Sequence, residues 1–313
     1  MTSSAKPPRT PPKKPLPHDA VRQAHSLRDY VVLCAGILAS LGLMSLVLTT
    51  SIGAWFYGEE LLESGAESAS PVADFIGSLI TYGIAIGLIL VVLLTFIRMM
   101  RQQFLGNALQ VEYSDYAWLR EWSNKVAADL DMPRVEIMVV QDPVMNAFAF
   151  GFATPYTIVL HSGTVRWLTP EQLKAIVVHE MAHVKYRHTQ ISTYLMLLRM
   201  PPGIGAINGW LLDFWSRRAE YTADRLAVAY LRDTSLVKEA LIGVHVGPDV
   251  ASSFNEVARQ WQVYMTDSYF NRFTQTFGSH PFLVRRLQCI DSFATGALAA
   301  ESTQAPSSPG ANT

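Results

Sequence analysis

The chain has 313 residues, of which 50% are hydrophobic and only 16% are charged, whereas an ordinary soluble domain is about 25% charged. This length suffices for one substantial domain, and the shortage of charge indicates that a further part of the chain lies in apolar surroundings. A net charge of -1 excludes a general attraction to nucleic acid, and two isolated cysteines, Cys34 and Cys289, give no indication of a disulfide framework.

The first 29 residues are rich in proline, lysine and arginine, most densely from Lys6 to Pro17. A segment of this composition cannot bury an apolar core, so we expect residues 1–29 to be disordered. No small-residue cleavage site follows the next apolar run, so this segment is not expected to be a signal peptide.

Two stretches without any charged residue follow, Tyr30–Ile52 and Phe75–Ile97. About 20 apolar residues suffice for a helix to cross the hydrocarbon core of a bilayer, and a soluble helix is rarely apolar on every face for so long. The sequence therefore predicts that residues 30–101 form a two-helix transmembrane anchor.

The charges that flank these helices predict their orientation. Lysines and arginines precede the first helix, and Arg98 and Arg101 follow the second, whereas the segment Gly53–Asp74 has five acidic residues and no basic one. The positive-inside rule then places the N-terminus and everything after residue 101 in the cytoplasm, and the acidic loop outside.

Residues 107–293 have the composition of a globular domain of the α+β class, mainly helical with a small β-sheet. A helix is predicted at Ala117–Leu130, and strands at Val135–Val140 and Thr157–Leu160. The segment Asn146–Gly151 is expected to be partly extended, and helices dominate after Thr169. The last residues, 294–313, are small and polar and are expected to form a disordered tail.

The segment that ends at His183 carries the pattern that decides the chemistry. Thr169, Pro170 and Gln172 together predict a helix start with Thr169 as the capping residue. On that helix His179 and His183 are four residues apart and share one face, so both rings can reach one metal ion.

Glu180 follows His179 directly, so it lies beside such an ion rather than on it. There it can take a proton from the attacking water, which is the role of the glutamate in this five-residue pattern. Zinc is the ion that this ligand type favours. Two unrelated histidines on a surface helix are the alternative, which the capped helix with its apolar face disfavours.

Zinc requires a third protein ligand and leaves its fourth position open in catalytic sites. His188 lies about 140° around the helix from His183, so we expect a polar residue near the helix end, with a ligand role as the lesser alternative.

Glu220 and Asp224 share one face of a second predicted helix. Glu220 can complete the metal site and Asp224 can fix the tautomer of a ligand histidine. The alternative is an ordinary solvated acidic pair.

From about Asn107 to Asp291 the chain resembles the integral-membrane metallopeptidases of the HtpX and CAAX-prenyl-endoprotease type. The resemblance rests on four segments in order: Asn146-Ala-Phe-Ala149, His179-Glu-Met-Ala-His183, Glu220-Tyr-Thr-Ala-Asp224, and Ser279-His-Pro281 before Arg286-Leu287. It implies a gluzincin, in which glutamate is the third ligand of one zinc ion. It further implies a membrane-anchored endopeptidase of a bacterial-type inner or plasma membrane that degrades misfolded or surplus membrane proteins.

The resemblance also implies roles for residues outside the metal site. An edge strand that pairs with extended substrate would consist of Asn146, Ala147, Phe148 and Ala149. His280 would stabilise the tetrahedral intermediate, or else Ser279 or His280 caps a helix whose first residue is Pro281. Arg286 is expected to anchor that helix electrostatically.

The chain departs from HtpX-type enzymes, which have two further membrane helices between the two zinc-binding helices. Only 36 residues separate His183 from Glu220, and the apolar stretch Ile191–Trp215 is broken by Arg199 and by Pro201-Pro202-Gly203. Each half has about ten residues, too few to span a bilayer. We therefore expect a helical hairpin that covers the site or dips into the membrane surface.

Three other functions compete with this one. Glu180 disfavours a catalytically inactive zinc-binding scaffold, because a structural zinc site closes its fourth position and needs no base. Lys174, Lys185 and Arg187 around the motif disfavour a site at bilayer depth. A prenyl-peptide processing protease remains an alternative with the same chemistry.

Overall fold

The computed structural model describes residues 18–62, 71–199, 204–268 and 280–304. Its helices are α1 (His18–Ala24), α2 (Leu27–Leu62), α3 (Pro71–Asn107), α4 (Ala117–Asp129), α5 (Ser162–Trp167), α6 (Pro170–Lys185), α7 (His188–Arg199), α8 (Gly205–Leu231), α9 (Thr234–Val246), α10 (Pro248–Ala251), α11 (Glu256–Thr266) and α13 (Leu283–Gln304). Its strands are β1 (Leu109–Gln110), β2 (Val135–Val140), β3 (Ala147–Phe150) and β4 (Tyr156–His161), and a 3₁₀ turn lies at Val111–Tyr113. The chain is thus α+β and mainly helical, as predicted.

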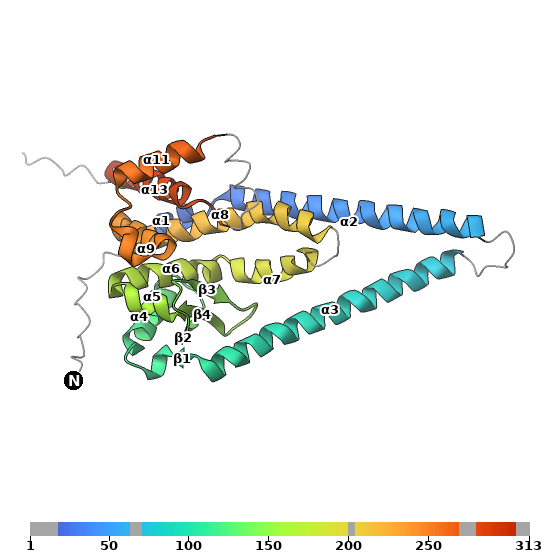
Figure 1. Cartoon of the computed structure of the whole chain (residues 1–313), viewed down its shortest axis with the longest axis horizontal. Coiled ribbons are helices and arrows are strands. Elements are labelled where there is room, and N and C mark those ends of the chain that lie inside the picture. The colour runs from blue at the N-terminus through green and yellow to red at the C-terminus, as the bar shows by residue number, and fades with distance from the viewer. Residues whose placement is uncertain (1–17, 63–70, 200–203, 269–279, 305–313) are drawn as a thin grey trace, which may run out of the picture.

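Two long helices, α2 and α3, extend away from the rest of the chain in the same general direction (Figure 1). They have 36 and 37 residues, and each contains a stretch long and apolar enough to cross a membrane. Large apolar side chains such as Leu38, Leu46, Ile84 and Val92 lie exposed along them.

One mixed sheet has the strand order β1-β2-β4-β3. β2 and β4 are parallel, whereas β1 and β3 pair antiparallel with their neighbours. Within the described part of the chain, β3 therefore forms one edge of the sheet. The strands predicted at 135–140 and 157–160 and the extended segment predicted at 146–151 are confirmed to within one residue at their ends.

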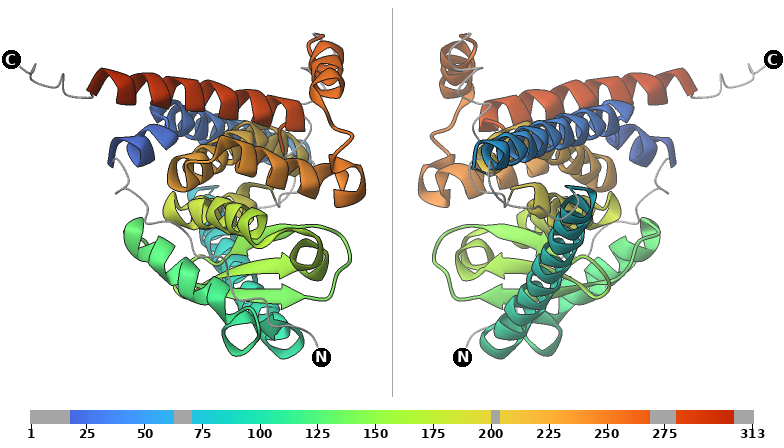
Figure 2. Two further views of the ribbon diagram at one scale, coloured as in Figure 1. Left: turned by 90° about the vertical axis from the view of Figure 1, so that its left-hand side faces the viewer. Right: turned by 90° about the vertical axis from the view of Figure 1, so that its right-hand side faces the viewer.

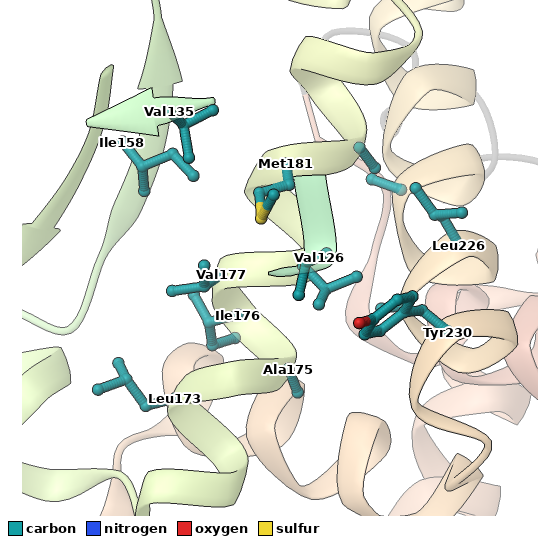
Figure 3. Packing of buried hydrophobic residues seen from close by; sticks show 14 of the residues in the cluster. Val126, Val135, Ile158, Leu173, Ala175, Ile176, Val177, Met181, Leu226 and Tyr230 are labelled. Carbon is teal, nitrogen blue, oxygen red and sulfur yellow. The ribbon is translucent and has the colours of Figure 1, made fainter. Parts of the chain in front are cut away.

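The hydrophobic core surrounds α6, which lies between the sheet and α8. In Figure 3, Val135 and Ile158 of the sheet lie on one side of α6, and Leu226 and Tyr230 of α8 lie on the other. Met181 of α6 is fully buried, and burying a side chain of this size stabilises the fold by about 1.5–3 kcal/mol. This packing fixes the position of the helix that carries the histidines.

The layers follow one another across the domain. Seen from the end in Figure 2, the sheet forms one flank, α6 lies next to it, α8 and α9 come next, and α13 with the start of α2 forms the opposite flank. The two helices expected to bind metal, α6 and α8, are therefore neighbours inside the domain.

Both ends of the described chain are more ordered than expected. Residues 18–24 and the stretch from residue 27 onward are helical, and Ala24 and Asp29 are buried. The expectation of disorder is therefore wrong for residues 18–29, and it is also wrong for residues 294–304, which continue α13. Residues 1–17 and 305–313 lie outside the described ranges. α13 begins at Leu283, so the expectation that Pro281 is its first residue is wrong as well.

Candidate metal centre

The local sequence fixes the residue at which α6 begins, and this start determines where His179 and His183 lie on the helix. The backbone N–H of Gln172 donates to the Thr169 hydroxyl at 3.2 Å, and the backbone N–H of Thr169 donates to Oε1 of Gln172 at 3.1 Å. Pro170 occupies the first turn. This reciprocal capping box, predicted from the sequence, satisfies amide groups that the helix itself leaves unpaired.

Three donor atoms from α6 and α8 converge. Nε2 of His179 lies 3.4 Å from Nε2 of His183. The Glu220 oxygens lie 3.3 Å from Nε2 of His179 and 3.8 Å from Nε2 of His183, and the ligand atoms of all three residues fall within 4.8 Å of one another.

This arrangement fits a divalent metal. A tetrahedral ion with ligand bonds of about 2.0–2.1 Å holds its ligand atoms roughly 3.3 Å apart, close to the separations between these atoms. Two imidazoles and one carboxylate are also the donor set of zinc sites that keep an open position. The geometry therefore brings together the three residues that the sequence suggested as ligands.

The charges on the donors depend on their buried partners. Burial lowers the pKa of His183 to about 4. Burial also acts to lower the pKa of His179, but the Asp224 and Glu220 carboxylates outweigh it and raise that pKa to about 10. Burial alone would raise the pKa of Glu220, yet the Arg286 guanidinium and the neighbouring histidines hold it well below the usual range. Glu220 is thus ionised and ready to bind a cation.

Glu180 lies in the same cavity as the donor atoms and is buried. Burial raises the pKa of its carboxyl to about 7, although the charge of His179 and, to a smaller extent, a hydrogen bond from the Ala149 backbone oppose this shift. A general base works best when its pKa lies near the working pH. Glu180 therefore combines the position and the basicity that proton transfer requires.

Asp224 contacts the ring nitrogen of His179 that is not the proposed metal ligand. Oδ1 of Asp224 lies 3.0 Å from Nδ1 of His179, so this nitrogen is the one that carries the proton when Nε2 binds a metal. Asp224 in turn accepts two hydrogen bonds from Arg286, at 2.7 and 2.8 Å. Burial opposes its ionisation, but the Arg286 guanidinium outweighs burial and lowers the pKa of Asp224 to about 2.

Arg286 is more than a helix anchor. It is buried, and its Nη1 lies 3.2 Å from Oε2 of Glu220. One guanidinium thus contacts the carboxylates of both Glu220 and Asp224. A single arginine near a helix start carries no sequence signal for such contacts, because Asp224 lies 62 residues earlier in the chain.

His188 does not lie where the sequence suggested. It is buried, and its Nδ1 lies 3.1 Å from Nδ1 of His183. α6 ends at Lys185, and Arg187 adopts a left-handed conformation with φ of 60°, so the chain turns before His188 begins α7. When Nε2 of His183 binds a metal, its Nδ1 carries the proton and donates to Nδ1 of His188.

His280 reaches the edge of the metal centre. Its Nδ1 lies 3.2 Å from Oε1 of Glu220, while two thirds of its side chain is exposed. The hydrogen bond to Glu220 raises the pKa of His280. Ser279 lies outside the described residues, and a capping role at Pro281 does not hold because α13 begins only at Leu283.

β3 lines the same cavity and turns one side of its backbone towards the free edge. Phe148 pairs with Val159, and the backbone N–H of His161 donates to the Asn146 carbonyl at 3.0 Å. In an antiparallel pair the backbone groups alternate in direction, so those of Ala147 and Ala149 point away from β4. The hydrogen bond from Ala149 to Glu180 agrees with this register.

The cavity has a volume of about 840 Å³ and extends well beyond the donor atoms. Its lining includes β3, one face of α6, parts of α7 and α8, and Ile97 of α3. A chamber of this size can admit an extended stretch of polypeptide alongside β3.

Comparison with known proteins gives one family match. Residues 114–207 and 202–294 match the sequence profile of Peptidase family M48. Over 208 residues the chain is 27% identical to the Plastoglobule-localized metallopeptidase 48, chloroplastic, of Arabidopsis thaliana, with 60% of each chain covered. Over 110 residues it is 31% identical to a Protease HtpX homolog of Methanocaldococcus jannaschii, with 35% of this chain and 38% of the relative covered.

The chain thus spans 60% or less of the length of these two relatives. The crystal structure of S. mikatae Ste24p aligns with 87% of this chain and 80% of its own, at 16% identity and a TM-score of 0.42, a value too low to establish a shared overall fold.

Proposed function

The chain belongs to peptidase family M48, as its motifs predicted, and on this basis we propose that it is a membrane-anchored zinc metalloendopeptidase. The observation that carries the proposal is the convergence of His179, His183 and Glu220 from two helices, with a buried carboxyl, Glu180, beside them. A scaffold that only holds zinc has no use for that additional acidic group.

The proposed reaction is hydrolysis of a peptide bond. Zinc bound by His179, His183 and Glu220 would supply Lewis acidity to the scissile carbonyl and to water. Glu180 accepts a proton from the attacking water and returns it to the leaving amine. Asp224 keeps His179 in the tautomer that offers Nε2.

Substrate positioning follows from the edge of the sheet. The N–H of Ala147 already donates to Oδ1 of Asn146, and the backbone of Ala149 donates to Glu180. The outward carbonyl groups of the two alanines can accept hydrogen bonds from an extended polypeptide, which would then lie across the cavity next to Glu180. Asn146 and Phe148 complete this strand. His280 is exposed at the rim and can donate to the oxyanion that forms.

The substrates are assigned to misfolded or surplus membrane proteins, by similarity to HtpX-type enzymes. α2 and α3 would anchor the chain, and the pattern of charges places residues 1–29 and the peptidase domain, 107–293, in the cytoplasm. Reporter fusions test this topology: a fusion after Arg101 should report a cytoplasmic position, and a fusion within Gly53–Asp74 an external one. An external signal after Arg101 would exclude the proposed orientation.

The test of the chemistry is a Glu180→Gln variant purified in detergent. The substitution keeps the shape of the side chain but removes the base, so we expect about one zinc per chain and a loss of cleavage of an unfolded model substrate by roughly 10²–10⁴-fold. Glu121→Gln, which alters an exposed residue of α4, is the matched control. Equal proteolysis by wild type and Glu180→Gln would overturn the mechanism.

A further inference from the structure

The hairpin, defined here as residues 188–199 of α7 and 205–216 of α8, packs against the part of α2 that the sequence assigns to the membrane. Leu195, Leu212 and Trp215 of the hairpin form a buried cluster with Leu33 of α2. A Cβ on Gly36 would lie 3.5 Å from the Leu211 carbonyl oxygen, so the two helices approach closely there. Leu33 and Gly36 both lie within the charge-free stretch of α2.

The distance that the hairpin extends along α2, and hence into the proposed membrane layer, follows from the antiparallel arrangement of α2 and α8. Asp29 accepts a hydrogen bond from Thr222 at 2.8 Å, whereas Gly36, further along α2, meets Leu211. The residues of α8 that precede Leu211 therefore lie still further along α2. At 1.5 Å per residue, Gly36 is about 9 Å beyond Tyr30, and the start of α8 is about 10 Å beyond that. The hairpin thus reaches about 20 Å along a layer of about 30 Å, without crossing it.

The charges of the hairpin suit an apolar layer. Between Ile191 and Ser216 the sequence has only two charged residues, Arg199 and Asp213, and these two form an ion pair at 2.8 Å. Charged groups at bilayer depth are costly unless they pair with each other or face a water-filled cavity, and this pair does both, because Arg199 and Asp213 also line the cavity.

One backbone carbonyl near the end of α7 also has a buried partner. Asn208 is fully buried, and its side-chain amide donates to the Leu198 carbonyl at 2.8 Å. A carbonyl near a helix end that pointed into lipid without a partner would cost several kcal/mol. The large exposed side chains of the hairpin outside the cavity lining are apolar: Tyr194, Ile207 and Phe214.

The inner face of the hairpin is polar and continuous with the metal centre. The cavity that holds His179 and Glu220 is also lined by Ser192, Thr193 and Ser216, and by Ile97 at the end of the charge-free stretch of α3. A polypeptide segment that unwinds at the membrane surface exposes backbone groups that need hydrogen-bond partners. The hydroxyls of Thr193 and Ser216 donate to carbonyls of their own helices, and their oxygens can accept hydrogen bonds from substrate N–H groups.

We propose that the hairpin enters the bilayer beside α2, and that its polar face docks the unwound end of a membrane-embedded polypeptide on its way to the metal centre. The docking role rests on the proposed peptidase function, whereas the position of the hairpin does not. Substrates would accordingly be cut close to the end of a transmembrane segment.

The position of the hairpin is tested by cysteine labelling in lipid nanodiscs, in a Cys34→Ser, Cys289→Ser background. Ile207→Cys on the hairpin should react with a charged maleimide at least tenfold more slowly than Val257→Cys, which lies exposed on α11. Both should react equally after denaturation in detergent. Equal rates in nanodiscs would place the hairpin outside the bilayer and overturn the proposal.

The docking role is tested by filling the cavity. Thr193→Trp puts a large side chain into the polar face, whereas Tyr194→Trp, on the outward face of the same helix, is the matched control. Cleavage is measured on a single-span membrane polypeptide with a site at its membrane end, and on an unfolded soluble peptide.

Thr193→Trp should lower the ratio of membrane-substrate to peptide cleavage at least tenfold, and Tyr194→Trp should leave the ratio as in wild type. A ratio unchanged by Thr193→Trp would overturn the docking role. Absence of any cleavage by wild type would contradict the proposed function and the docking role with it, while the labelling rates would still decide where the hairpin lies.

Discussion

Each donor of the metal centre contacts a second polar group that holds it in place. His179 has Asp224 behind it, His183 has His188, and Glu220 lies between Arg286 and His280. Partners of this kind fix the tautomer and the orientation of metal ligands. The side chains of the candidate centre are therefore held in position by their partners, and we expect its metal affinity to depend on residues that would not touch the ion.

His188 gives the sharpest prediction among these partners. His188→Ala removes the acceptor for Nδ1 of His183, so we expect zinc affinity, measured by competition with a chelating dye, to fall by about 10–100-fold. The absorption spectrum of the cobalt-substituted protein should shift as well. His188→Asn retains an acceptor and should keep affinity nearer to wild type, and Thr189→Val is the control for the neighbouring buried position. Equal affinities of His188→Ala and Thr189→Val would contradict this role.

Among the individual residues, the sequence correctly predicted those positions that depend only on spacing along a helix. Two histidines four residues apart on a helix must share a face, and the same holds for Glu220 and Asp224. The position of His188 depends on the left-handed turn at Arg187, where no glycine marks the end of the helix. Arg286 meets Asp224 only through the packing of α13 on α8, which no local pattern encodes.

Among the elements, β3 depends on a close contact with the chain that follows it. Gly163 at the start of α5 donates its backbone N–H to the Asp142 carbonyl at 2.9 Å, and a Cβ on Gly163 would collide with the Pro143 carbonyl. The carbonyl of Pro143 belongs to the backbone, so it cannot move out of the way as the end of a flexible side chain could. A glycine at position 163 therefore allows the segment before β3 to lie against α5, next to the metal centre.

Gly163→Ala should consequently destabilise the fold. The added methyl group forces the backbone apart, so we expect a loss of about 1–3 kcal/mol in the free energy of unfolding, seen as a lower Tm. Gly296→Ala is the control, because a Cβ there meets nothing within 4 Å, and alanine in a helix is favoured by about 0.5–1 kcal/mol over glycine. A Tm for Gly163→Ala as high as that of Gly296→Ala would show that the contact is relaxed in solution.

The elements that the sequence predicted best have strong local signals. The capping box at Thr169 and the β-branched runs of β2 and β4 need no knowledge of distant residues. Residues 18–29 and 294–304 were expected to be disordered because their composition is polar or small. The helix at 18–24 instead packs on α8, with Ala24 fully buried, so tertiary contacts override composition there.

On the scale of the whole molecule, α8 connects the proposed anchor to the candidate metal centre. It packs against α2 and carries Glu220. Asp29, at the start of α2, is buried, pairs with Arg218 and Arg225, and accepts a hydrogen bond from Thr222. These three residues of α8 flank Glu220 and Asp224. The base of the proposed anchor thus contacts the helix that carries the proposed third metal ligand, through a hydrogen bond across 193 residues that sequence patterns do not reveal.

Asp29→Ala should break this link. Removing one partner of a buried ion pair leaves the other charge uncompensated, which costs up to about 3–5 kcal/mol. We expect a clearly lower Tm in detergent and weaker zinc retention on dialysis. Glu112→Ala, which removes an exposed carboxylate that lies 3.9 Å from Arg120 and far from the centre, should change stability by less than about 1 kcal/mol. Similar losses in the two variants would rule out a special role for Asp29.

The most direct test of the account is the zinc content of the Glu220→Ala variant, measured by mass spectrometry after dialysis. Wild type and the control Glu121→Ala should retain about one zinc per chain, whereas Glu220→Ala should retain almost none, because two histidines of one helix alone hold zinc weakly. A Glu220→Ala protein that retains as much zinc as wild type would contradict a metal centre built from α6 and α8.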